Sequence, residues 1–198
     1  MLKNNKKIDI FATNIRRVFS CYKFSIFELI SVKSRFFDKL LINIREPYFK
    51  NEIEIAKITS KDRVLHIGCG INPTHCILIA RHTQAKVVGI DNSSKAVSLA
   101  RKYIKKNGFH ESIKIELADG KQYNVKNFDV IFVAINVFPI DSVLKNLSRQ
   151  LKKGTRVLCK SIKSDIPEVV KKHGFSNDFQ IVDMVKNPKT QYYLLIKK

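Results

Sequence analysis

The sequence has few cysteines, and none of them belongs to a metal-binding or disulfide motif. The four cysteines stand at positions 21, 69, 76 and 159, with no Cys-x-x-Cys pair and no histidine at zinc-ligand spacing. This pattern argues against a zinc domain and a disulfide scaffold, so we predict no metal site. Isolated cysteines are typical of reduced thiols in a cytoplasmic protein.

Long apolar runs are also missing. No stretch approaches the roughly 20 apolar residues that a membrane-spanning helix needs. The lysine-rich first residues lead into Ile8-Asp9-Ile10 rather than into the apolar core of a cleavable leader. We therefore expect a soluble, cytoplasmic protein with no membrane partner. No linker rich in Gly, Pro or Ser divides the chain, so its parts are expected to pack together.

Acidic residues are scarce relative to basic ones. The 198 residues include 37 Lys and Arg but only 17 Asp and Glu, which gives a formal net charge of +20. One interpretation is an anionic partner such as RNA, because clustered basic side chains neutralise phosphates. The other is compositional bias, which we favour because the basic residues are spread along the whole chain.

The most informative segment lies between residues 64 and 73. Val64–Ile67 is a short apolar run with one histidine, as expected for a buried strand. Gly68 and Gly70 follow, and glycine lets a ligand approach the backbone closely. Asn72 suits a helix N-cap and Pro73 suits the first helical position. A strand, a glycine turn and a helix N-terminus form the place where an open α/β sheet binds a nucleotide-like ligand.

Three further strands are predicted over residues 85–91, 113–117 and 128–134. Asp91 ends the first of these about 20 residues after the glycines, where a carboxylate accepts hydrogen bonds from ribose hydroxyls. Asp119 follows the next strand and is a candidate partner for an adenine amino group.

The remaining chain continues the alternation of strand and helix. Two final strands, over 179–185 and 191–196, are joined by a short connection, which implies an antiparallel pair because parallel strands need a crossover. We therefore predict an α/β fold: a Rossmann-like, seven-stranded, mostly parallel sheet whose last strand is antiparallel, with helices on both faces. Ser93 or Ser94 is expected to cap a helix that reaches Ile104. The other predicted elements are a helix over 141–151, a strand over 156–160 and a last helix that opens at Asp165 and is closed by Gly174.

Four segments together resemble the class I S-adenosylmethionine-dependent methyltransferases: His66–Gly70, Gly89–Asp91, Leu117–Gly120 and Phe128–Ile131. The resemblance covers roughly residues 60 to 198 and implies S-adenosylmethionine as the cofactor. His66 departs from the family, which usually has an acidic residue there that helps to hold the ammonium end of the cofactor. The cofactor-binding residues that the resemblance implies are Gly68, Cys69, Gly70, Asp91, Asn92, Asp119, Gly120 and Ala134.

Residues 1–60 are expected to form a helical cap ahead of a cofactor-binding domain at 61–198. Apolar spacing predicts one helix over 8–22, and a capping box at Ser25–Glu28 predicts a second helix that ends at about Ile44. Pro47 is expected to begin a third helix that reaches Ile58. We predict that the cap closes the acceptor pocket at the open edge of the sheet.

A second resemblance concerns the turn and the segment before the first strand. Gly68–Pro73 is similar to the Gly-x-Gly-x-x-Pro turn of the nicotianamine synthases and related metallophore enzymes, and Pro47–Asn51 is similar to their Pro-Tyr-Tyr-x-Asn segment. Those enzymes share the fold but transfer the aminopropyl arm of S-adenosylmethionine to an amine or amino acid. The resemblance implies that Tyr48 and either Glu52 or Glu54 line the acceptor pocket and orient or deprotonate an amine.

No strong acceptor signature is present. Asn136–Pro139 only partly matches the Asn-Pro-Pro-aromatic element of amino-group methyltransferases, and Cys159 lacks the preceding proline of an RNA-cytosine nucleophile. His75 and His82 are interpreted as ordinary helix residues. We expect a transferase, with methyl transfer to a small molecule placed first because it is the commoner reaction on this fold. Aminopropyl transfer is second, and a basic RNA-binding module without enzymatic activity is third.

Overall fold

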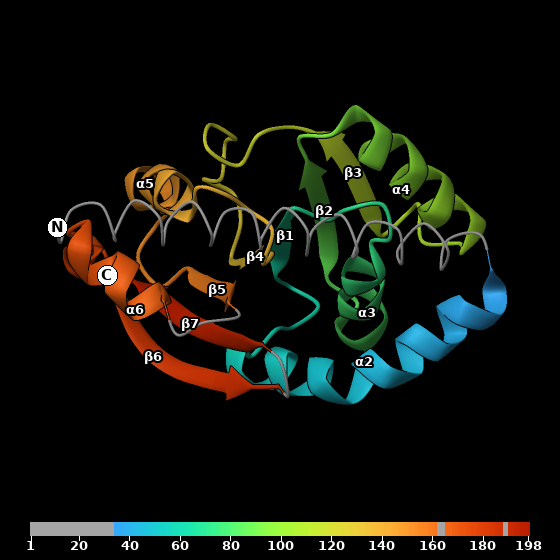
Figure 1. Ribbon diagram of the computed structural model, residues 1–198, viewed down its shortest axis with the longest axis horizontal. Coiled ribbons are helices and arrows are strands. Elements are labelled where there is room, and N and C mark those ends of the chain that lie inside the picture. The colour runs from blue at the N-terminus through green and yellow to red at the C-terminus, as the bar shows by residue number, and fades with distance from the viewer. Residues whose placement is uncertain (1–33, 162–164, 188–189) are drawn as a thin grey trace, which may run out of the picture.

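A computed structural model describes residues 34–161, 165–187 and 190–198. Its centre is one seven-stranded sheet in the order β3-β2-β1-β4-β5-β7-β6, in which β7 runs antiparallel to both of its neighbours (Figure 1). This arrangement confirms the predicted Rossmann-like sheet. The strands are β1 Arg63–Ile67, β2 Lys86–Asp91, β3 Ile113–Leu117, β4 Val130–Val133, β5 Arg156–Ser161, β6 Phe179–Lys186 and β7 Gln191–Lys197.

Helices cover both faces of this sheet, as predicted, and each face has its own apolar core. Alternation along β1 sends Val64 into one core and Leu65 into the other. The first core contains side chains from α2, α3 and α4, and the second contains side chains from α5 and α6. The helices are α2 Arg35–Ala56, α3 Thr74–Thr83, α4 Ser94–Lys106, α5 Ile140–Gln150 and α6 Ile166–Lys172, with a 3-10 turn, η1, at Phe175–Asn177.

Helix α2 corrects one prediction. A single helix runs from Arg35 to Ala56 with Pro47 inside it, whereas a break near residue 45 and a new helix at Pro47 were expected. A proline removes the hydrogen bond to the carbonyl four residues earlier, here that of Asn43. Both Asn43 and Pro47 are exposed, so water can satisfy this carbonyl and the helix continues. The helix and capping box predicted before residue 34 lie outside the described residues.

The end of α2 is joined to the sheet by one arginine. Arg156, the first residue of β5, donates from Nη1 to the carbonyls of Ala56 (2.7 Å) and Lys57 (2.8 Å) and pairs through Nη2 with Asp62. Helix α2 also contacts α3, β6 and β7, and in Figure 1 it runs along the lower edge of the molecule below α3. These contacts hold α2 against the side of the sheet that carries the first apolar core.

The first turn of α3 differs slightly from the prediction. Helix α3 begins at Thr74 with Pro73 as its N-cap, one residue later than expected. Asn72 still caps this turn, because its Oδ1 accepts the Thr74 backbone N–H at 3.1 Å. At the next helix, Ser93 is the N-cap of α4 and accepts from the Ala96 backbone N–H, which confirms one of the two serines considered there.

Candidate active site

A cavity of about 510 Å³ lies where the parallel strands end. Its wall is formed by the segments that follow β1, β2, β3 and β4, by the end of β5, and by one side of α2. Carboxyl ends of parallel strands are where open α/β sheets bind ligands. All eight residues that the sequence nominates as cofactor-binding line this cavity.

The glycine turn forms the floor at one end. Gly68 and Gly70 have φ angles of +81° and +69°, which favour glycine. The Gly68 backbone N–H donates to the Ile90 carbonyl at 2.8 Å, so the turn is held against the end of β2. A Cβ atom on Gly68 would lie 2.7 Å from Cγ2 of Val137. Both the conformation and the packing therefore require glycine at position 68.

Asp91 fixes the other side of this turn. Its Oδ2 accepts the Gly70 backbone N–H at 2.9 Å, and its Oδ1 accepts the Ser93 backbone N–H at 3.0 Å. Each carboxylate oxygen has a further lone pair, and the half-buried side chain lines the cavity. Asp91 thus combines a structural role in the turn with an acceptor available to a ligand.

The loops after β3 and β4 complete this end. Asp119 accepts the Lys121 backbone N–H at 2.9 Å, and a Cβ on Gly120 would lie 2.5 Å from Cγ2 of Ile67. The Ala134 backbone N–H donates to the Ile67 carbonyl at 3.0 Å, so the loop after β4 borders the glycine turn.

The opposite end is built around Glu52 of α2, which is 3% exposed. Glu52 Oε2 lies 2.8 Å from Nε2 of His75, the Asn187 side-chain amide donates to its Oε1 at 3.4 Å, and the Tyr192 hydroxyl donates to the carboxylate. Burial raises the pKa of Glu52 to about 7, although the positive charge of Lys160 acts in the opposite direction. Glu52 therefore changes charge near neutral pH.

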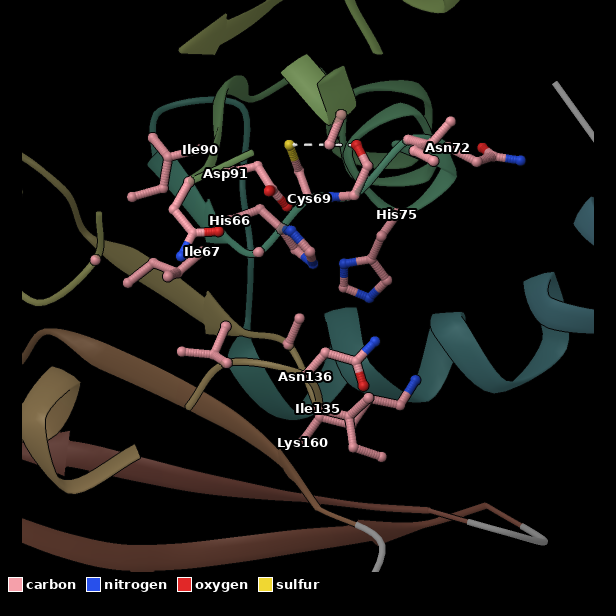
Figure 2. A pocket seen from close by; sticks show the side chains of 18 of the residues that line it. His66, Ile67, Cys69, Asn72, His75, Ile90, Asp91, Ile135, Asn136 and Lys160 are labelled. Atoms are coloured by element: carbon pink, nitrogen blue, oxygen red, sulfur yellow. Dashed lines mark hydrogen bonds between the residues drawn. The ribbon is translucent and has the colours of Figure 1, made fainter. Parts of the chain in front are cut away.

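Two histidines stand beside this carboxylate. The rings of His66 on β1 and His75 on α3 lie side by side, tilted by 50° to each other, with their centres 4.7 Å apart (Figure 2). Burial lowers the pKa of both imidazoles well below the usual value, and nearby positive charge adds to the effect, so both rings are neutral at pH 7. The Nδ1 atom of each ring is buried without a hydrogen-bond partner among the described residues.

Helix α2 supplies one candidate catalytic residue on the cavity wall besides Glu52. Tyr48 lines the cavity and remains 39% exposed. Glu54 does not line it: the side chain is exposed on another face of α2, because residues two apart on a helix point in different directions. The structure thus brings Tyr48 and Glu52 together at the cavity and separates Glu54 from them.

The family assignment follows from the part of the chain that contains the glycine turn and Asp91. The family described as "Methyltransferase domain" matches residues 58–198, more than half of the chain. The chain belongs to the methyltransferase domain family. S-Adenosylmethionine is the cofactor of this family.

Several known proteins are similar to this chain in sequence or in fold. Methyltransferase GfsG of Streptomyces halstedii is 28% identical over 109 residues, which cover 52% of this methyltransferase-family chain and 39% of GfsG. The RNA methyltransferase of Salinibacter ruber, solved with S-adenosyl-L-homocysteine, has the same fold (TM-score 0.62, 20% identity, 76% of this chain and 90% of that chain). A mutant of MtNAS, a nicotianamine synthase, solved with S-adenosylmethionine also shares it (TM-score 0.74, 19% identity, 91% and 74%).

Sequence reasoning missed three residues at the end of the cavity that is built around Glu52. His75 was interpreted as an ordinary helix residue, and Lys160 and Tyr192 were not singled out. Lys160 carried a usable signal, since it stands at the carboxyl end of a predicted parallel strand. The partners of His75 and Tyr192 come from distant segments, so neither residue had a local signal.

Two features are absent from the described residues. None of the helices within 34–161, 165–187 and 190–198 is long and apolar enough to cross a membrane. In the same ranges, no group of three His, Cys, Asp or Glu side chains is arranged to bind a metal ion. Cys69, Cys76 and Cys159 are buried free thiols.

Proposed function

We propose that this chain is an S-adenosylmethionine-dependent methyltransferase that acts on a small molecule bound in the cavity. The observation that carries the proposal is the geometry at Asp91. A carboxylate is held by two backbone N–H groups at the end of β2, beside a glycine turn with two positive φ angles. Together with the family assignment, this arrangement supports a nucleoside-binding end in the cavity.

The residues at this end fit S-adenosylmethionine. Asp91 would accept hydrogen bonds from the ribose hydroxyls, and Asp119 would accept from the adenine amino group. Gly68, Cys69, Gly70, Asn92, Gly120 and Ala134 would surround the remainder of the cofactor, since they line the same space. His66 stands where the family usually has an acid, so a neutral imidazole would take the place of that acid beside the amino-acid end of the cofactor.

When bound, the cofactor supplies carbon atoms activated by an adjacent sulfonium. The chain itself contributes orientation and a base. Glu52 has a pKa of about 7 and is the best-placed group to hold a proton from an acceptor, with Tyr48 as a second polar side chain on the same wall. The Glu52–His75 contact fixes the carboxylate in place, and the rings of Phe49 and Phe132, which pack against His75, reduce the access of water to this contact.

Aminopropyl transfer is the second candidate. Both reactions attack a carbon beside the sulfonium, and the pose of the cofactor decides which carbon faces the acceptor. The observation that favours this alternative is that the similarity to MtNAS covers 91% of the chain and so extends beyond residues 58–198. An acceptor-side glutamate on α2 is also consistent with deprotonation of an amine. An RNA-binding role remains the third interpretation, based on the +20 charge.

The decisive experiment is incubation with S-adenosylmethionine and cell extract, followed by mass spectrometry of the cofactor product. S-Adenosylhomocysteine would indicate methyl transfer, and methylthioadenosine would indicate aminopropyl transfer. Salt-dependent RNA binding with neither product would favour the non-enzymatic alternative.

We further propose that residues 1–60 serve as a cap on the cofactor-binding domain at 61–198. Support comes from α2, whose residues Arg45, Tyr48, Phe49 and Glu52 line the cavity. A cap in this position would exclude water from the reacting centre. Removal of residues 1–33 tests how much of the segment is needed: a variant that binds S-adenosylhomocysteine normally and retains turnover would limit the cap to α2.

A further inference from the structure

We propose that Lys160 is the binding group for a carboxylate of a small molecule in the cavity. The inference rests on the proposed function, because it assigns a ligand group to the same space. The carboxylate has two chemically equivalent sources, namely the acceptor and the amino-acid end of the cofactor. The experiment below separates them.

The setting of Lys160 is unusual for a lysine. It is the fifth of the six residues of β5 and stands directly opposite Tyr192 of β7 in the antiparallel register. Its Nζ lies 4.7 Å from the centre of the Tyr192 ring, and the side chain lines the cavity on the side that faces α2 (Figure 2). Burial lowers the pKa of Lys160 even though the negative charge of Glu52 opposes this change.

The ammonium lacks a bonded counter-ion among the described residues. No carboxylate oxygen in these ranges lies within ion-pair distance of its Nζ, and Glu52, the nearby acid, is engaged by His75, Asn187 and Tyr192. A partly desolvated cation without a bonded anion is unfavourable. A cation–π contact gives the ammonium only a fraction of the stabilisation that a bound anion would give. A bound carboxylate would provide the anion that the Lys160 ammonium lacks.

The two ends of the cavity differ in the sign of their net charge. The glycine-turn end is lined by Asp91, by Asp119 and by Lys121, which pairs with Asp119 at 3.1 Å. The end formed by α2 and β5 is lined by Arg45, Lys160 and Glu52. The two imidazoles there are neutral at pH 7, so an ionised Glu52 leaves an excess of one positive charge over Arg45, Lys160 and Glu52. One excess positive charge matches the single negative charge of a carboxylate and is too little to neutralise a phosphate dianion.

The test uses acetate, the simplest carboxylate, with acetamide as its neutral counterpart. The full-length protein is titrated while NMR follows the Lys160 side chain and the Tyr192 ring. Three states are compared: the free protein, the protein loaded with methylthioadenosine, which lacks the amino-acid end, and the protein loaded with S-adenosylhomocysteine, which has it. The variants are Lys160→Met, which removes the charge, Lys160→Arg, which keeps it, and Lys153→Met, an exposed control outside the cavity.

We expect saturable acetate binding, and none of acetamide, in the free and methylthioadenosine-loaded wild type. Lys160→Met should weaken acetate binding at least about tenfold, while Lys160→Arg and Lys153→Met stay within about threefold. Acetate binding that persists with S-adenosylhomocysteine assigns the subsite to the acceptor. Binding that disappears assigns it to the carboxylate of the cofactor.

The proposal is overturned if the wild type binds no acetate, or if Lys160→Met binds it as well as the wild type does. Calorimetry with S-adenosylhomocysteine is run in parallel. A protein that binds acetate through Lys160 but no S-adenosylhomocysteine would contradict the proposed function and leave the carboxylate subsite intact.

Discussion

The Nε2 atom of His75 lies 2.8 Å from the Oε2 atom of Glu52, and this contact joins α3 to α2 inside the cavity. Above about pH 7 the carboxylate is ionised, so His75 donates its Nε2–H and keeps its lone pair on Nδ1. That Nδ1 has no partner among the described residues and lies beside the ring of His66. The contact therefore sets the tautomer of a histidine that sequence reasoning regarded as ordinary.

The first prediction concerns Glu52 as the proposed base. Glu52→Gln should lower the turnover number by about 10²–10⁴-fold, because a positioned base contributes an effect of this size. The wild-type rate should fall below about pH 7 as Glu52 gains a proton, and the variant should lack this acidic limb. The matched control is Glu54→Gln, since Glu54 is exposed on the same helix. An unchanged pH–rate profile in Glu52→Gln would exclude Glu52 as the base.

The second prediction concerns stability and pH. Glu52 has a pKa of about 7 in the folded chain and 4.5 as its ordinary value. Between these values the folded state holds a proton that the unfolded state has lost, so the free energy of unfolding falls as pH rises through this window. At 1.36 kcal/mol per pKa unit, the loss is about 3 kcal/mol.

Urea unfolding at about pH 5 and about pH 8 measures this loss. The wild type and Glu54→Gln should lose more stability across this interval than Glu52→Gln, because glutamine does not titrate. Equal losses in all three proteins would show that the Glu52 pKa is not raised.

The third prediction concerns the cofactor. Asp91→Ala should weaken the binding of S-adenosylhomocysteine by about 1–3 kcal/mol in calorimetry, because the ribose loses a charged acceptor. Asp91→Asn should show a smaller loss, since the amide keeps one acceptor oxygen. Asp183→Ala, an exposed change on β6, serves as the control. Normal binding by a folded Asp91→Ala protein would refute the ribose assignment.

The fourth prediction separates backbone strain from steric overlap. Gly68 and Gly108 both have positive φ angles, +81° and +75°, but only Gly68 has a close neighbour at the position of a Cβ. Gly108→Ala should cost about 1–2 kcal/mol of unfolding free energy from conformation alone. Gly68→Ala should cost about 1–3 kcal/mol more because Val137 must move. Equal costs in urea unfolding would mean that the Val137 contact relaxes freely.

The glycine-turn end of the cavity could be predicted because its determinants are local. Gly68 and Gly70 indicate a turn by their residue type, and Asp91 indicates a strand end by its place after an apolar run. Each of these residues takes its position from its immediate neighbours and from one strand pairing.

The end of the cavity built around Glu52 could be predicted only in part because its contacts join residues that are distant in the sequence. Glu52 and His75 are 23 residues apart, and Glu52 and Asn187 are 135 apart. The course of α2 through Pro47 was also missed, since a proline usually ends a helix and the sequence does not reveal that the affected carbonyl faces water. Helical spacing alone did not distinguish Glu52, which lines the cavity, from Glu54, which does not.

The position of β7 inside the sheet has a consequence for synthesis. Strand β7 pairs with β5 on one side and β6 on the other, yet it follows every other described element in the chain. Because translation proceeds from the N-terminus, the β5 edge stays open until residues 191–197 have been made. Tyr192, which donates to Glu52 and lies opposite Lys160, arrives with this strand. A nascent chain can therefore form the glycine turn and position Asp91 before the end of the cavity around Glu52 is complete. The whole cavity forms only when the last strand has been made.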